Sequence, residues 1–127
     1  MTDTYIYLIR ENDWDSDRYL PGGEPADDAE MTFSAHKAFQ QAVVELGARV
    51  VAGNALQSAK YGGIATPGEA DRKVDDAVYT DSPYADSSEL ITGFYAVECD
   101  DEDTARTVAA MVPTGGTIEW RKVFPTG

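Results

Sequence analysis

The hydrophobic and polar residues of this chain follow two different periods, one typical of strands and one typical of helices. Residues 4–10, T-Y-I-Y-L-I-R, are β-branched or aromatic with apolar side chains on both faces, and they predict a central strand. Residues 93–99, G-F-Y-A-V-E-C, have the same two-faced pattern, which is typical of a strand covered on both sides. The other expected strands are residues 48–53, 73–80 and 117–123.

A first helix is predicted before the second strand. Either Thr32 or Ser34 can cap it, acidic residues precede it, and it is expected to run to about Leu46, where Gly47 ends it. One apolar stripe at helical spacing consists of Ala35, Phe39, Ala42, Val43 and Leu46. His36 lies about 100° round the helix from Ala35, so it is expected at the border of the stripe, within reach of both the core and a cleft.

A second helix is predicted after the strand 93–99. Asp100 is expected to be its N-cap, and the acidic residues behind Asp100 favour the positive end of the helix. We interpret this acidic run as capping rather than metal binding, because a calcium loop needs a longer alternating pattern and a distal glutamate. The apolar stripe of this helix is Ala105, Val108, Ala109 and Val112, and Pro113 stops it.

The predicted order is strand, helix, strand, one or two further strands, strand, helix, strand. This order favours a single α+β domain over residues 1–127, a ferredoxin-like sandwich with both helices on one face of an antiparallel sheet. The other face would be left bare and apolar, with Tyr5 or Ile6, Phe94 or Tyr95, and Ile118 or Trp120 pointing to it. We expect a second copy of the chain to cover that open sheet face about a two-fold axis, which makes a homodimer.

Two segments interrupt the regular pattern. Residues 11–29 are acidic and contain Pro21-Gly22-Gly23, so they predict a long loop, and Trp14 within it either closes the edge of the core or lines a ligand cleft. Residues 54–68 are polar and rich in glycine, and they are expected to cover the sheet as a loop or an extra hairpin.

Composition then narrows the partners. The chain has 127 residues and a formal net charge of −13, which argues against nucleic acid and against anionic membrane surfaces. No run of 18 apolar residues predicts a membrane span, and the N-terminus resembles no signal peptide. The single Cys99 cannot form an internal disulfide and is interpreted as a small core residue. These features favour a cytoplasmic protein.

The segment before the strand 93–99 contains the most distinctive local pattern. Asp81-Ser82-Pro83 is a turn initiator, because Pro83 fixes its own φ and the Asp81 side chain can accept hydrogen bonds from the amides that follow. Tyr84 follows the turn, where its ring can lie over a cleft.

These residues resemble a known family. Asp81 to Glu89, followed by Gly93-Phe94-Tyr95, is similar to the D-G-P-F-A-E-x-K-E…G-[FY]-[YF] segment of the YCII-related (YciI-like, DGPF) domain family. Residues 53–57 and the ending Gly115 to Arg121 are similar too, so the resemblance covers most of the chain. Ser82, Tyr84, Asp86 and Ser88 depart from the pattern. The resemblance implies a dimeric α/β barrel.

Five residues are candidates for a site. His36 is the only histidine, with a side chain that titrates near neutral pH, and the family resemblance implies a His–Asp pair in which Asp81 orients it. Tyr84, Trp14 and Glu89 are expected to contribute to binding. No metal is expected, because a second histidine and a cysteine cluster are missing, and no glycine pattern typical of a nucleotide cofactor is present.

Three functions remain open at this point. The first is a small-molecule binding domain with a pocket near His36, Asp81 and Tyr84, without a cofactor. The second is a cofactor-free enzyme, of an isomerase, lyase or dehydrochlorinase-like kind, in which His36 and Asp81 transfer protons. The third is a regulatory interaction domain, because the resemblance implies relatives beside transcription-associated proteins.

Overall fold

The computed structural model describes residues 2–12, 29–57, 61–80 and 90–125, and the side chains of 29–32 are not part of this description. In these residues the chain forms an α+β fold. Its elements are β1 (Asp3–Glu11), α1 (Ala29–Glu45), β2 (Arg49–Ala55), β3 (Ile64–Thr66), a 3₁₀ turn (Val74–Asp76), β4 (Val78–Thr80), β5 (Leu90–Cys99), α2 (Glu102–Met111) and β6 (Thr117–Lys122).

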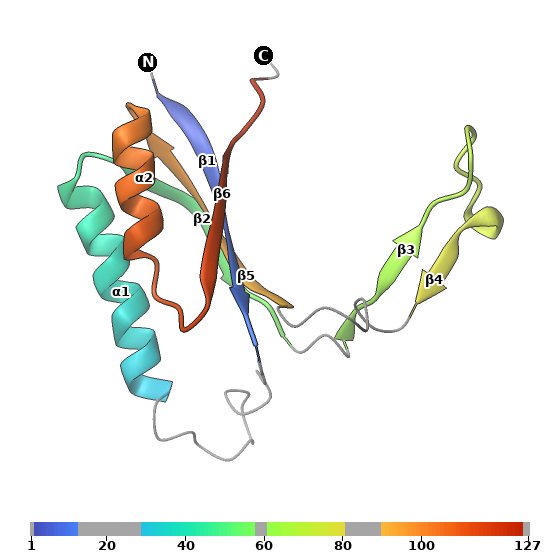
Figure 1. Ribbon diagram of the computed structural model, residues 1–127, viewed down its shortest axis with the longest axis horizontal. Helices are drawn as coiled ribbons and strands as arrows, with labels where there is room; N and C mark the ends of the chain where they lie inside the picture. Colours follow the sequence, from blue (N-terminus) through green and yellow to red (C-terminus); the bar gives the residue numbers. More distant parts are fainter. Residues whose placement is uncertain (1, 13–28, 58–60, 81–89, 126–127) are drawn as a thin grey trace.

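Four strands form one antiparallel sheet in the order β2-β5-β1-β6. The apolar strands β1 and β5 are the two central strands, as their two-faced sequences predicted. Both helices lie on the same face of the sheet (Figure 1). The ferredoxin-like arrangement expected from the sequence is therefore confirmed.

The core lies between this face and the two helices. It contains Tyr5, Tyr7 and Ile9 from β1, Tyr95, Val97 and Cys99 from β5, Phe39 and Val43 from α1, and Ala105, Val108, Ala109 and Val112 at α2. The whole predicted stripe of α2 is buried, whereas Ala35 and Leu46 of the predicted α1 stripe are exposed. The Tyr7 hydroxyl donates to the Ala105 carbonyl at 2.7 Å, which ties β1 to α2.

The helix ends differ in part from the prediction. α1 begins at Ala29, ahead of the predicted caps Thr32 and Ser34. α2 is capped by Asp101, not Asp100, because the Asp101 carboxylate accepts the Thr104 amide at 2.7 Å. Gly47 ends α1 as expected, with a φ of 83° that a residue with a Cβ rarely adopts.

A β-bulge between Val50 and Ala52 changes the facing of β2. Val50 pairs with Val97, but Ala52 pairs with Ala96 and Gly53 with Tyr95. β2 therefore has one more residue than β5 at this point, and the side chains of β2 after the bulge point to the opposite face of the sheet from the one that unbroken alternation would give. Gly53 is placed on the helix side, opposite Tyr95.

The face of the sheet away from the helices, which we call the open face, is only partly apolar. Ile6 and Phe94 point to it, as one of each predicted pair should, together with Leu8 and Ala96. The prediction for β6 was wrong: Ile118 and Trp120 pair with Ile9 and Tyr7 and so share the helix face.

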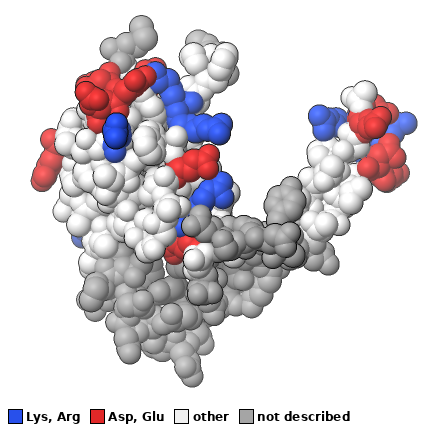
Figure 2. All heavy atoms as spheres, viewed as in Figure 1, with Lys and Arg blue, Asp and Glu red and all other residues white. Residues whose placement is uncertain are grey.

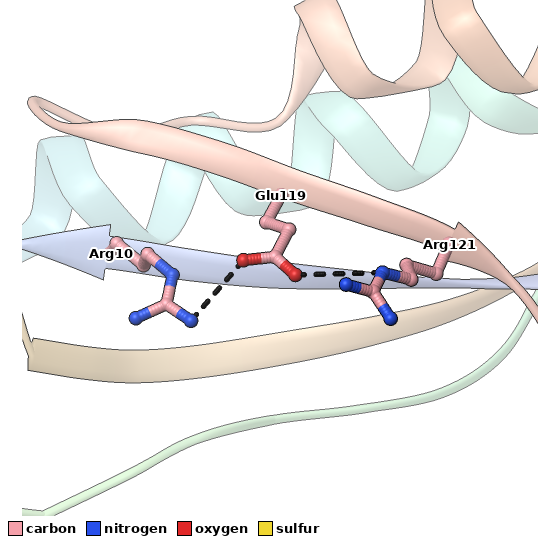
Figure 3. Close-up of polar contacts among 3 residues, drawn as sticks. All are labelled: Arg10, Glu119 and Arg121. Carbon is pink, nitrogen blue, oxygen red and sulfur yellow. Dashed lines mark hydrogen bonds and ion pairs between the residues drawn. The ribbon is translucent and has the colours of Figure 1, made fainter.

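Charged residues of β6 take their place on the open face. Glu119 accepts from Arg10 Nη2 at 3.2 Å and lies 3.7 Å from Arg121 Nε, so one carboxylate joins β1 and β6 (Figure 3). At the opposite edge Arg49 Nη2 lies 3.2 Å from a Glu98 oxygen. Ion pairs thus flank the apolar centre of the open face.

Residues 61–80 form a separate hairpin, which we call the arm. β3 and β4 pair with each other in a two-stranded sheet and do not join the four-stranded sheet. The predicted strand 73–80 is thus shorter than expected, and it follows a 3₁₀ turn at Val74–Asp76. The arm projects away from the body instead of covering the sheet (Figure 1). No helix among the described residues is long and apolar enough to cross a membrane.

Candidate functional site

The single histidine makes a close contact with the central strand. His36, on α1, is half-buried, and its Nδ1 lies 2.7 Å from the hydroxyl of Tyr95 on β5. The two rings are 5.9 Å apart between centroids. One ring nitrogen of His36 therefore has a fixed hydrogen-bond partner, and such a partner sets the orientation of the imidazole.

Tyr95 reaches His36 because its neighbours leave room for the ring and then hold it. A Cβ on the cross-strand neighbour Gly53 would come within 2.6 Å of Tyr95 Cδ1, so only glycine permits this ring position. On the other side Phe39 packs against the ring, with centroids 4.8 Å apart. Glycine at residue 53 and the buried Phe39 thus direct the hydroxyl toward the first half of α1.

Burial raises the pKa of the Tyr95 phenol, and a hydrogen bond with Gln40 acts in the opposite direction. The phenol therefore keeps its proton at neutral pH. When this proton is donated to His36 Nδ1, the neutral imidazole carries its own proton on Nε2.

Burial also sets the charge of the imidazole. It lowers the pKa of His36 below the ordinary value of 6.5, and the negative charge of Glu11 at the end of β1 acts in the opposite direction. At neutral pH the side chain is therefore an uncharged ring.

Stability is expected to depend on pH through this residue. Because the folded pKa is lowered, the unfolded chain binds the proton at a higher pH than the folded chain does. The free energy of unfolding should therefore fall as the pH drops through 6.5 and below. Urea unfolding at pH 7.5 and pH 5 should show a smaller loss for His36→Gln than for the unmodified chain, since carboxylates contribute equally to both. An NMR titration of the single imidazole that gave a pKa of 6.5 or higher would contradict this.

The other predicted site residues lie outside the described residues. These are Asp81, Tyr84, Trp14 and Glu89, together with the turn 81–83 and most of the loop 11–29. His36 is half-buried at the edge of the helix stripe, where the sequence put it. The partner that the structure gives its Nδ1 is Tyr95.

Sequence reasoning missed Tyr95, Gln40 and Gly53 as parts of the site. Gln40 had a usable signal, because it lies one helical turn after His36 and so on the same side of α1. Tyr95 was left open, since either it or Phe94 could have faced the helices. The role of Gly53 depends on the bulge in β2, which the sequence pattern did not show.

Neither the cysteine nor a metal site adds to the candidate site in the described residues. Cys99 is buried, as predicted, and burial raises the pKa of its thiol. Among the residues that the structure describes, no group of three or more His, Cys, Asp or Glu side chains could hold a metal ion.

Comparison with known proteins gives one match. Residues 16–126 match the family described as YCII-related domain. A comparison with curated proteins found no match. The matched range covers α1, β2 and β5, and so includes His36, Gly53 and Tyr95.

Proposed function

This chain belongs to the YCII-related domain family, and from that premise we propose that it binds a small molecule at the His36–Tyr95 pair. The observation that supports this is the 2.7 Å contact between His36 Nδ1 and the Tyr95 hydroxyl. Within the part of the chain that the structure describes, the second ring nitrogen of this half-buried imidazole has no hydrogen-bond partner, so it can form a hydrogen bond with a ligand. Small-molecule sites generally combine apolar walls with a few such placed polar groups.

The chemistry of the pair favours a neutral ligand with a hydrogen-bond acceptor. With Nδ1 accepting from the phenol, Nε2–H of His36 is a donor, and it would bind a carbonyl or similar oxygen. The net charge of −13 and the nearby Glu11 disfavour an anion. We propose Asp81, Tyr84, Trp14 and Glu89 as further contacts with the ligand, on the strength of the sequence pattern.

The test uses the single histidine as a reporter. Cyclohexanone and phenol, as neutral probes, should shift the His36 Cε1–H resonance in a saturable way. His36→Gln should weaken binding of the better probe about tenfold, since it removes a hydrogen bond to the ligand of about 1–1.5 kcal/mol. Tyr95→Phe should also weaken binding, because it removes the hydrogen bond that holds the imidazole in place. The affinity of the His36→Gln variant, which has no imidazole resonance, is measured by calorimetry.

Gln41→Ala is the matched control, because Gln41 is exposed on the same helix. It should leave the affinity unchanged. If neither probe shifts the imidazole resonance at millimolar concentration, or if His36→Gln binds as well as the unmodified chain, the proposed site is wrong.

A proton-transfer enzyme is the second candidate, and one specific observation favours it. The Tyr95 hydroxyl and the imidazole form a chain of two exchangeable protons. Nε2 can give its proton to a carbonyl oxygen while Nδ1 takes one from the phenol and a water molecule takes up the α-hydrogen, which forms the enol; the proton on that water then returns to the tyrosinate. A neutral imidazole can polarise a carbonyl group in this way by donating its N–H to the carbonyl oxygen. The test is the rate at which cyclohexanone exchanges its α-hydrogens for deuterium in D₂O. An enzyme should accelerate this exchange and His36→Gln should not, whereas a binding domain should leave the rate unchanged.

We further propose that a second copy covers the open face. Its apolar centre, formed by Ile6, Leu8, Phe94 and Ala96, supports this. The flanking carboxylates of Glu119 and Glu98 each pair with an arginine of the same chain, and this pairing limits the charge repulsion between two identical faces. A two-fold axis lets one surface serve both copies.

A further inference from the structure

The arm is folded within itself but exposes apolar side chains. Three pairs join its strands, Ile64 with Thr80, Ala65 with Tyr79 and Thr66 with Val78. Gly68 packs so closely on Asp76 that a Cβ there would come within 2.6 Å of the aspartate Cβ. Yet Val74, Val78 and Tyr79 are 76%, 61% and 65% exposed.

An arm of this kind needs support from another surface. A two-stranded hairpin is marginally stable at best in water, and here each strand has three residues. Figure 2 shows uncharged side chains along the stalk and charged ones at the tip. The apolar stalk is therefore suited to packing and the tip to remaining in solvent.

The direction of the arm points to where that surface is. The helices lie on one side of the sheet, and the arm projects on the other, the side of the open face (Figure 1). A second copy seated on the open face would therefore lie next to the arm of the first. By the two-fold symmetry its own arm would in turn reach the first copy.

The size of the open face supports the same partner. Four strands at about 4.8 Å spacing and roughly seven residues long give a flat footprint of roughly 400 Å² per copy. A standard interface buries about 800 Å² per partner, so the sheet face by itself makes a small interface. Two arms add apolar surface to it.

We propose that the arm of each copy packs against the other copy and clasps the dimer. This inference rests on the proposed pairing of open faces, and it adds that the arm residues Val74, Val78 and Tyr79 are buried only in the dimer. The partner is therefore a second copy of this chain, not an unrelated protein.

The first experiment measures the mass of the particle across a range of concentrations by sedimentation equilibrium. The double variant Val74→Glu/Val78→Glu should raise the dimer dissociation constant about 100-fold, since two valines lose their burial and two charges are added. Val44→Glu is the matched control, because Val44 is 66% exposed on α1, away from both the arm and the open face. It should leave the constant unchanged.

The outcomes separate the two proposals. A monomeric unmodified chain overturns both the pairing and the clasp. A dimer that the arm variant leaves unchanged overturns the clasp alone and keeps the pairing.

A second experiment detects the packing of the arm without disrupting the dimer. A polarity-sensitive dye on Val78→Cys reports the surroundings of the stalk, and the native Cys99, buried with a raised thiol pKa, should stay unlabelled. Its emission should shift to shorter wavelength with the same midpoint as dimer formation, and the same dye on Val44→Cys should not shift. A blue emission at every concentration, or no shift at all, would show that the arm does not pack on a second copy.

Discussion

Replacing Gly116 with alanine is expected to cost about 3 kcal/mol of unfolding free energy, or roughly 10 °C in Tm. A Cβ at this residue would collide with the carbonyl oxygen of Arg10 and lie 3.1 Å from the Cα of Glu11. These atoms belong to the backbone of β1, so no side-chain rotation relieves the contact. The turn before β6 would have to move away from β1, and thermal unfolding followed by circular dichroism measures the loss.

The neighbouring glycine provides the control for this substitution. A Cβ on Gly115 would meet no atom within 4 Å, and its φ is not in the left-handed region. Gly115→Ala should therefore be neutral or slightly stabilising, because alanine restricts the unfolded chain. Equal melting temperatures for the two variants would show that the close approach of residue 116 to β1 is wrong.

The substitution also tests how the site is built. The Thr114 hydroxyl accepts the Gly116 amide at 2.9 Å and donates to the Glu11 carboxylate at 2.9 Å. This short network holds the end of β1, where the charge of Glu11 acts on the imidazole. Displacing the turn would therefore be felt at His36 as well as in stability.

Replacing Gly53 with alanine is expected to remove the His36–Tyr95 contact and to cost about 2 kcal/mol of stability. The added Cβ would lie 2.6 Å from Cδ1 and 2.9 Å from Cε1 of the Tyr95 ring, so the ring must leave its place. Without the phenol as donor and with more water around it, the imidazole should regain a pKa closer to 6.5. NMR titration of the only histidine measures this rise directly.

Gly62→Ala is the matched control, since a Cβ there would meet no atom within 4 Å. It should change neither the melting temperature nor the titration of His36. The Gly53→Ala variant should also lose affinity for the neutral probes, as Tyr95→Phe does. If its imidazole titrates as in the unmodified chain, Tyr95 is not held in place by the glycine.

Much of the fold could be predicted from local pattern alone. The two-faced apolar runs of β1 and β5 placed them at the centre of the sheet, and the stripe of α2 is buried at every predicted residue. His36 was found as a candidate because it is the only histidine and falls at the edge of an apolar stripe. These features depend on side-chain periodicity within one element, which a sequence displays directly.

The parts that failed depend on register between distant segments. Ile118 or Trp120 was expected on the open face, but both pair with helix-side residues, Ile9 and Tyr7, and so lie on the helix side. A single extra residue in β2 exchanged the facing of Gly53, because side chains alternate with a period of two. Residues 54–68 were expected to cover the sheet as a loop or an extra hairpin, and residues 73–80 to form a strand. Instead β3 and β4 pair only with each other.

Both helices, the strands of the main sheet and the candidate histidine of this YCII-related domain could thus be found from the amino-acid sequence, because apolar residues recur with a local period and the histidine lies at the edge of one apolar stripe. Three other facts became visible only in the folded chain: Tyr95 is the partner of that histidine, Gly53 makes room for the Tyr95 ring, and the arm stands on the open side of the sheet. Those three facts depend on strand register and on the bulge, which arise from contacts between segments about 40 or more residues apart and leave no periodic trace in the chain.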